Sequence, residues 1–300
     1  MKSIQSIIIL VVGDIMLDKY TVGEVNRISP EAPVQIVDVK EEYSTLGGSG
    51  NVVRNIRKLG AQVDCLASVG NDFEGEIIKT KLKEIGVEDL TFSGSDRTIV
   101  KERIIADHRL VQMLRIDREI KKTVKPHLPI GILKKLKGDY DIIVVSDYAK
   151  GMITSELIKY LKTNYSANII IDPKPINTWM YNDIFMITPN EEEWNQMQVA
   201  SSYIMNPEYI LQTMGKKGMK LIERDKECFI EAESVDVYNV SGAGDTVVAI
   251  MAVCISMELD ILVCAKIANK CASYVVTQPG TSIVPKNKFM NIIDGYIQGE

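Results

Sequence analysis

Six short apolar runs, rich in Ile and Val, recur through the first 222 of the 300 residues, and stretches with helical patterns separate them. The runs are Ile7–Val12, Val63–Val69, Ile142–Ser146, Ile169–Asp172, Ile184–Ile187 and Met219–Ile222. They are continuous rather than alternating, so we expect strands that are buried on both faces. The pattern predicts an α/β fold in which helices flank a mostly parallel sheet.

Helices are expected at Asn51–Leu59, Asp72–Ile85, Ser155–Lys162, Pro189–Val199 and Thr246–Met257. In the fourth of these, Thr188 is the expected N-cap, Pro189 takes the first helical position, and Glu191 completes a capping box.

Two segments break the alternation of strand and helix, Val34–Tyr43 and Thr98–Asp117. We interpret them as exposed strands of a small antiparallel sheet, a candidate lid, with insertions at about 15–45 and 92–117. No internal repeat or low-complexity linker is evident, so residues 1–300 are expected to form a single domain. Exposed lid edges favour a homodimer formed by strand pairing.

Composition excludes several classes of protein. The net charge is −5 and no long basic run occurs, which argues against a nucleic-acid partner. The N-terminal apolar run has no cleavage site after it, and the run 246–257 is too short to span a bilayer. We therefore expect a cytoplasmic protein with no membrane partner. The five cysteines are scattered, which favours reduced thiols over disulfides or a zinc site.

Three aspartates, Asp14, Asp147 and Asp172, lie at or just after the ends of expected core strands. Ligands of open α/β sheets bind at the carboxyl ends of the strands, so these acids predict a polar ligand site. Capping of the following helices is the alternative.

The loop Gly242-Ala243-Gly244-Asp245 precedes the last of these expected helices. No GxxxxGK[ST] motif occurs, and "GAGDTV" does not match GxGxxG, so neither a P-loop nor a dinucleotide fingerprint is present. Small residues before a helix leave amides free to bind a transferring phosphoryl group, and Asp245 could take the proton of an attacking alcohol. Alternatively, Asp245 only stabilises the first helical turn.

Two other stretches suggest ligand contacts. In "GGSGN", Gly47 and Gly48 would let the backbone approach a polyhydroxy ligand that Asn51 could bind, although they could also be turn glycines. In "TPNEEE", the expected capping leaves Asn190 and Glu193 on one helical face, where they could orient water on the Mg²⁺ of ATP.

Together "GGSGN", "NEEE" and "SGAGDT" resemble the ribokinase-like (PfkB) carbohydrate kinases, from Val12 to about Lys286. Further stretches resemble the heptose 7-phosphate kinase domain of ADP-heptose synthesis: "GDIMLDKY", "RISPEAPV", "RTIVKERI", "VVSDYAKG", "IDPK" and "QPGTS". That kinase is often fused to a nucleotidyltransferase with an HxGH motif. Neither histidine here lies in such a motif, so we expect only the kinase half.

The resemblance implies ATP- and Mg²⁺-dependent phosphorylation of the anomeric hydroxyl of D-glycero-β-D-manno-heptose 7-phosphate to the 1,7-bisphosphate. Asp245 would be the base, and the amides of Gly242, Ala243 and Gly244 the anion hole. Sugar-side positions would be Asp14, Asp18, Gly47, Gly48 and Asn51. Candidates for the substrate's own phosphate are Lys101, Arg103 and Lys150, which could equally be solvated cations. Nucleotide-side positions would be Lys174, Asn190, Glu191, Glu192, Glu193, Thr213, Gly215, Gly218 and Asn269, with Glu193 reaching Mg²⁺ through water.

Alternatives stay open. A kinase of fructose phosphate, ribose or a nucleoside would share this catalytic core, and a non-catalytic sensor could share the fold. The sequence also departs from the family pattern, with "GGSGN" where "GGAAN" is usual.

The second departure concerns a monovalent cation. Asn239, two residues before Ser241, stands where relatives commonly carry an Asp that helps bind K⁺. A neutral amide lowers the charge of that site, so we expect turnover to depend only weakly on K⁺. Steady-state rates with K⁺ exchanged for Na⁺ check this, and a large increase in K⁺ would contradict it.

Overall fold

The computed structural model describes residues 1–107, 111–119, 128–278 without 201–205, and 280–297. Its main sheet has ten strands in the order β14-β13-β12-β11-β10-β9-β1-β4-β5, with β6 also paired to β4. The strands are β1 Ile8–Gly13, β4 Gln62–Gly70, β5 Glu88–Asp89, β6 Phe92–Ser95, β9 Ile142–Ser146, β10 Asn168–Asp172, β11 Met186–Ile187, β12 Tyr209–Thr213, β13 Gly218–Glu223 and β14 Lys226–Glu231. The pairing is parallel from β5 to β12 and antiparallel from β12 to β14. The expected mostly parallel sheet is confirmed.

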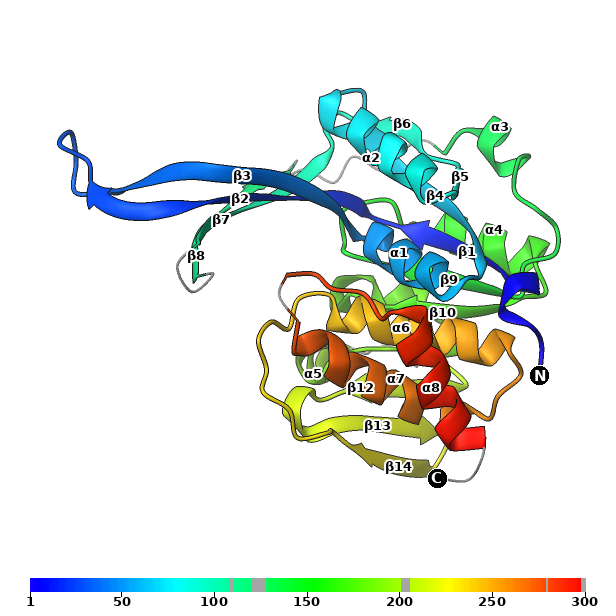
Figure 1. The fold of residues 1–300 in the computed structure, drawn as a ribbon. Helices are drawn as coiled ribbons and strands as arrows, with labels where there is room; N and C mark the ends of the chain where they lie inside the picture. The colour runs from blue at the N-terminus through cyan, green and yellow to red at the C-terminus, as the bar shows by residue number, and fades with distance from the viewer. Residues whose placement is uncertain (108–110, 120–127, 201–205, 279, 298–300) are drawn as a thin grey trace.

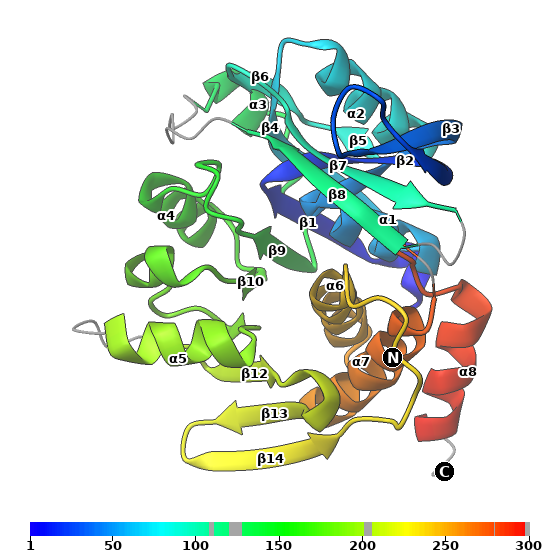
Figure 2. The same ribbon diagram turned by 90° about the vertical axis from the view of Figure 1, so that its left-hand side faces the viewer.

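Helices cover both faces of this sheet (Figures 1 and 2). One face carries α1 Ser49–Leu59, α2 Phe73–Glu84, α6 Ala243–Ser256, α7 Ile261–Val276 and α8 Lys286–Ile297, and the other carries α3 Ile130–Leu133, α4 Ser155–Asn164 and α5 Glu191–Ala200. Three short 3₁₀ turns complete the described elements: η1 Ile4–Ser6, η2 Pro175–Met180 and η3 Gly215–Lys217. Alternate residues of β1 enter the two cores, Ile9 and Val11 on one side and Leu10 and Val12 on the other. This explains the continuous apolar run.

Helix α6 is buried on every side. All residues from Asp245 to Cys254 are buried, and the helix packs against α1, α7, β9 and β10. A helix that is apolar all round belongs inside a protein core. Its N-terminus, which points to the carboxyl ends of the central strands, is therefore held rigidly.

The lid is a four-stranded sheet that projects from the body (Figure 1). Its strands are β2 Ile15–Ile28, β3 Gln35–Gly48, β7 Ile99–Ala106 and β8 Val111–Arg118, in the order β3-β2-β7-β8. The β2–β3 and β7–β8 pairs are antiparallel, whereas β2 and β7 pair in parallel. Because β6 pairs with β4 of the main sheet, the second lid segment begins at Ile99 rather than near residue 92.

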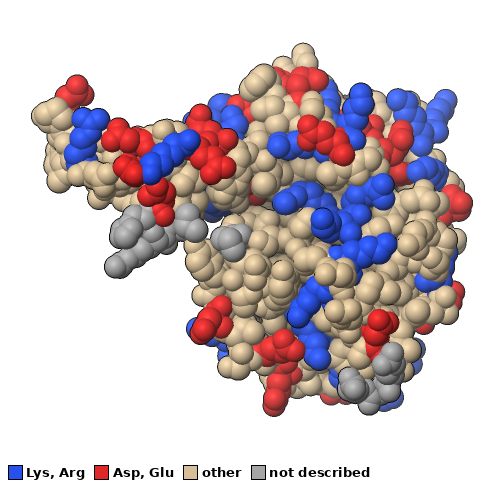
Figure 3. Space-filling model, in the orientation of Figure 1, with Lys and Arg blue, Asp and Glu red and all other residues tan. Residues whose placement is uncertain are grey.

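Acidic and basic side chains are interspersed along the projecting lid (Figure 3). Lys40, for example, pairs with both Glu24 and Asp107.

All five cysteines are free. None of the helices in the described part of the chain is long and apolar enough to cross a bilayer.

Candidate active site

The predicted strand-end acids meet at the carboxyl edge of β1, β9 and β10, but two of them bind the protein itself. Asp14 accepts hydrogen bonds from the amides of Tyr148, Lys150 and Met152, at 2.9, 3.0 and 3.1 Å. Asp147 accepts from the Ala149 amide at 2.6 Å and from the side chains of two residues in and just after η2. Both carboxylates therefore organise loops of the protein, and the ligand site predicted from these strand-end acids stays a prediction.

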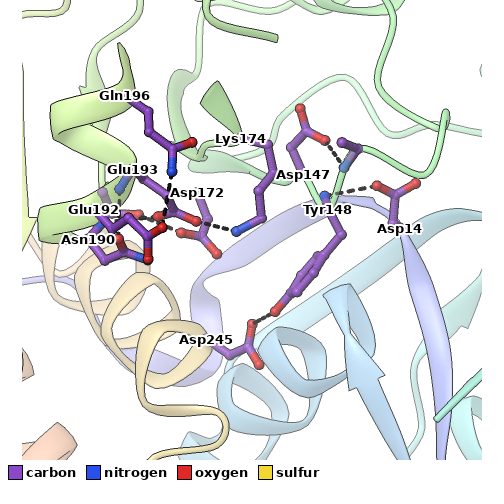
Figure 4. A network of polar contacts seen from close by, with 12 residues as sticks. Asp14, Asp147, Tyr148, Asp172, Lys174, Asn190, Glu192, Glu193, Gln196 and Asp245 are labelled. Carbon is purple, nitrogen blue, oxygen red and sulfur yellow. Dashed lines mark hydrogen bonds and ion pairs between the residues drawn. The ribbon is translucent and has the colours of Figure 1, made fainter. Parts of the chain in front are cut away.

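Asp245 lies in the first turn of α6, where its side chain is buried (Figure 4). Its Oδ1 accepts a hydrogen bond from the Tyr148 hydroxyl at 2.8 Å, and its Oδ2 accepts from Asn51 Nδ2 at 2.9 Å. Burial raises the pKa of this carboxyl, while both hydrogen bonds lower it. Asn51 thus orients the predicted base, and its predicted contact with a sugar stays a prediction.

Helix α6 begins at Ala243, not at Thr246 as the sequence suggested, because Gly242 takes the left-handed conformation with φ 81° and serves as the N-cap. The Ala243 amide donates to Val240 O at 3.3 Å. Among the described residues, no hydrogen-bond acceptor engages the amides of Gly242 and Gly244, so these are the free donors of the predicted anion hole. A methyl group added to Gly244 would meet nothing within 4 Å.

The glycine pair at the start of α1 is required by packing. A Cβ on Gly47 would lie 2.4 Å from Asp18 Oδ2, and one on Gly48 would lie 2.4 Å from the carbonyl oxygen of Asp14. Gly48 also has a positive φ of 57° and is the N-cap of α1. The turn explanation therefore accounts for both glycines without a ligand.

Two of the three cations predicted for the substrate phosphate already have carboxylate partners. Arg103 binds Asp18 in a largely buried ion pair at 2.8 Å, and Lys150 binds Glu119 at 2.6 Å. Lys101 instead lies over the Tyr148 ring, with Nζ 5.3 Å from the centroid, and burial lowers its pKa. Lys101 and Arg103 are two residues apart on strand β7 and so point to the same face, whereas Lys150 lies in the loop after β9.

The expected capping of α5 is wrong. Asn190 is the capping residue: the Glu193 amide donates to Asn190 Oδ1 at 2.8 Å, and the Asn190 amide donates to Glu193 Oε2 at 3.0 Å. Thr188 stays in the sheet, where its amide bonds to Ile171 O. Asn190 and Glu193 therefore form the capping box that was assigned to Thr188 and Glu191.

Glu193 also pairs with Lys174, whose Nζ lies 5.4 Å from the centroid of the Tyr148 ring (Figure 4). Asp172 lies beside this pair. Burial raises the pKa of Asp172 to about 8, and the charges of Asp245 and Glu193 add to that rise. Asp172, Glu193 and Asp245 thus lie near one another, and the positive charge of Lys174 partly offsets their negative charges.

The remaining nucleotide-side positions line connected hollows. A cavity of about 580 Å³ is bounded by Thr213, Gly215, Gly218, Asn269 and the start of α6 at Ala243 and Gly244, with an apolar wall that includes Val235, Val237 and Val240. Asn190, Glu191 and Glu192 line a neighbouring hollow that shares Thr213 and Gly215. Gly218 is again explained by packing, because its Cβ would lie 2.0 Å from Ile230 O.

The side chain of Asn239 has a structural partner. Its Oδ1 accepts a hydrogen bond from the Ser241 amide at 2.8 Å, and its own amide donates to Val276 O. This turn leads the chain into the glycine loop.

Sequence reasoning missed two residues of the site, Tyr148 and Arg54. Tyr148 directly follows the strand-end Asp147, which placed it at the ligand edge of the sheet. Arg54 lies three residues after Asn51 on α1, hence on the same helical face, and donates to Asn51 Oδ1 at 3.3 Å. Both positions could have been found from spacing alone.

The predicted ATP site implies a magnesium ion. In the described part of the chain, no group of three or more His, Cys, Asp or Glu side chains could hold a metal. Asp172 and Glu193, which influence one another electrostatically, carry the carboxylate oxygens that Mg²⁺ prefers. They fit a metal that is bound partly by phosphate oxygens.

Solved structures of low sequence identity share this fold. Phosphofructokinase-2 from Escherichia coli in complex with potassium superposes with a TM-score of 0.77 over 97% of this chain and 99% of that one, at 17% identity. Ribokinase from Arabidopsis thaliana complexed with ribose and ATP gives 0.72 over 96% and 98%, at 19% identity. The fold is thus ribokinase-like.

The family model for pfkB family carbohydrate kinases matches residues 8–287, and the chain belongs to that family. It is a phosphotransferase that acts on sugar hydroxyls. One curated relative, the bifunctional protein HldE of Desulfatibacillum aliphaticivorans, is 38% identical over 92% of this chain. The aligned region is 61% of that relative's length.

The two glycines of the loop should respond differently to alanine. Gly242→Ala places a Cβ 2.7 Å from Asn51 Nδ2 at a φ of 81°, so we expect it to lower the free energy of unfolding by about 1–3 kcal/mol. Gly244→Ala meets open space inside a helix and should be neutral or stabilising by up to about 1 kcal/mol. Denaturant unfolding of both variants checks this, and equal stabilities would contradict it.

Proposed function

We propose that this chain transfers the γ-phosphoryl group of ATP to the anomeric hydroxyl of D-glycero-β-D-manno-heptose 7-phosphate, giving the 1,7-bisphosphate and ADP. The observation that carries the proposal is a buried carboxylate, Asp245, in the same helical turn as the free amides of Gly242 and Gly244. Asp245 would then act on the attacking sugar hydroxyl, and the amides of Gly242 and Gly244 on the phosphoryl group that it attacks.

In this mechanism Asp245 takes the proton of the sugar hydroxyl as its oxygen attacks the γ-phosphorus. The new oxygen–phosphorus bond forms while the bond to the leaving ADP breaks. The amides of Gly242 and Gly244 lie at the positive end of the α6 dipole and stabilise the negative charge on the transferring group. Burial raises the pKa of Asp245, which makes it a stronger proton acceptor.

The nucleotide belongs in the cavity beside the start of α6. Its apolar wall at Val235, Val237 and Val240 suits a purine ring, and Gly244 lines the same cavity. Thr213, Gly215 and Asn269 lie around the same space. Glu193, with Asp172 beside it, would hold the Mg²⁺ of ATP through water, and the bound metal would supply positive charge to the triphosphate.

The sugar belongs between the lid and the carboxyl ends of β1 and β9. Lys101, which lies over the Tyr148 ring, is the best placed cation for the phosphate that the substrate already carries. Arg103 could contribute only by sharing its charge with Asp18, and Lys150 by leaving Glu119. A phosphate would relieve the burial cost that lowers the pKa of Lys101.

The heptose assignment rests on the family motifs, with which the 38% identity to an HldE protein is in keeping. The residues that carry the chemistry would serve a fructose phosphate, ribose or a nucleoside equally well. Only the lid and the adjoining loops distinguish these substrates.

The experiment that tests the substrate measures ADP release with a panel of acceptors at equal concentration. We expect kcat/KM for heptose 7-phosphate to exceed that for fructose 6-phosphate, ribose and adenosine by at least about 100-fold. Ribose and adenosine lack the phosphate that Lys101 would contact, and fructose 6-phosphate carries its phosphate on a carbon chain that is one carbon shorter. An active hexose or pentose beside an inactive heptose would reject the assignment but not the kinase class.

Replacing the base tests the mechanism. Asp245→Asn keeps the shape of the side chain but cannot accept the proton, so turnover should fall by about 10²–10⁴-fold. Binding of ATP and sugar, measured by calorimetry, should persist. The matched control is Asp225→Asn in the exposed β13–β14 turn, which should leave turnover unchanged. Near-normal turnover of Asp245→Asn would remove Asp245 from this role.

We further propose that the enzyme acts in the cytoplasm as a homodimer joined through the lid. The outer lid strands β3 and β8 expose Val39, Met113 and Leu114, which a second copy would cover. A monomer in sedimentation equilibrium at micromolar concentration would contradict the dimer.

Weak K⁺ dependence remains part of the proposal, because the side-chain oxygen of Asn239 is already bonded to Ser241.

A further inference from the structure

We propose that Tyr148 is a positioning residue for phosphoryl transfer: its hydroxyl holds the Asp245 carboxylate in place and in its ionised form, and thereby sets how far activity extends into acid. The inference rests on the proposed role of Asp245 as the base. The geometry that supports it is the 2.8 Å hydrogen bond from the Tyr148 hydroxyl to Asp245 Oδ1 (Figure 4).

The hydroxyl is a dependable donor. Burial and the nearby charge of Asp245 raise the pKa of Tyr148 well above its ordinary value, so the group stays protonated throughout the range in which enzymes work. A protonated hydroxyl beside a carboxylate must act as the donor. The bond is therefore charge-assisted whenever Asp245 is ionised.

The backbone and the ring of Tyr148 are also held in place. Its backbone amide donates to Asp14 Oδ2 at 2.9 Å, and the Lys150 amide binds the same oxygen at 3.0 Å. Its ring lies beneath two ammonium groups, Lys101 from the lid at 5.3 Å and Lys174 from the loop after β10 at 5.4 Å. Tyr148 thus touches the proposed sugar side, the proposed nucleotide side and the base.

Asp245 itself has a defined electrostatic setting. Asn51 and Tyr148 donate hydrogen bonds to it, and the charged groups that face it from the surrounding elements are Asp18 of β2, Arg54 of α1, Lys101 of β7 and Asp172 of β10. Burial raises the pKa of Asp245, and the two hydrogen bonds oppose that rise. Removing the Tyr148 hydroxyl removes one of them, so the pKa must rise further.

The sign of the effect on activity follows directly. Only ionised Asp245 accepts a proton, so activity is present above the pKa of Asp245 and is lost as the pH falls through it. In Tyr148→Phe that pKa is higher, and activity is lost at a higher pH than in the wild type. Phenylalanine keeps the ring that lies beneath Lys101 and Lys174.

The test compares wild type and Tyr148→Phe by two measurements. Carbon-13 NMR of carboxyl-labelled aspartate, with the Asp245 signal assigned by its absence in Asp245→Asn, gives the pKa without any substrate. We expect a rise of about one unit. The acid limb of kcat/KM for heptose 7-phosphate should move up by the same amount, and kcat at the plateau should fall by roughly tenfold because the base is less well placed.

Tyr140→Phe is the matched control. Tyr140 also donates to a buried carboxylate, Asp64 Oδ2 at 2.7 Å, but it lies at the amino end of β9, whereas the site lies at the carboxyl end. That variant should lose stability without moving the acid limb. If Tyr148→Phe leaves both the Asp245 titration and the acid limb unchanged, the inference is wrong. If Asp245→Asn retains turnover, the proposed function fails, and the NMR titration still decides whether Tyr148 holds the carboxylate.

Discussion

The arrangement of the site depends on one carboxylate, that of Asp14, which anchors the neighbouring loop. Asp14 ends the central strand β1 and accepts three backbone amides from residues 148–152, at 2.9–3.1 Å. Burial, opposed by these hydrogen bonds, raises its pKa to about 6. The interaction ties the loop after β9 to the neighbouring strand. This interaction positions Tyr148 and, through it, Asp245. Asp14, which the sequence assigns to the sugar side, thus also determines where other residues of the site lie.

The second constraint is the crowding of acids at one edge of the sheet. Asp172, Asp245 and Glu193 influence one another electrostatically, and burial raises the pKa of Asp172 to about 8. Such a group is costly to ionise unless cations or hydrogen-bond donors face it. Lys174 supplies charge on one side, and Tyr148 and Asn51 supply donors on the other. A carboxylate that is stabilised by neutral donors keeps its affinity for a proton better than one paired directly with a cation, and Asp245 is of the first kind.

The sequence predicted the parts of this molecule that local rules govern, and it missed those that distant contacts decide. Continuous apolar runs revealed six of the main-sheet strands, because burial on both faces leaves no polar alternation. Position 190 shows the opposite case. Thr188 and Asn190 are both good caps, but the sheet retains Thr188, and Asn190 bridges to Thr213, so the helix starts later. Likewise, Asp18 and Arg103 are 85 residues apart, and only the pairing of β2 with β7 brings them together.

That parallel pairing also bears on how the molecule assembles. Strands β2 and β7 meet in register from Met16 and Ile99 onward, across most of the N-terminal third of the chain. Contacts between such distant positions carry a large loop-closure entropy and form slowly. Strand β4, which lies between the two hairpins in sequence, pairs with β1, and we expect this part of the main sheet to form before the hairpins join. The projecting lid is therefore expected to become ordered late, after the interior that supports it.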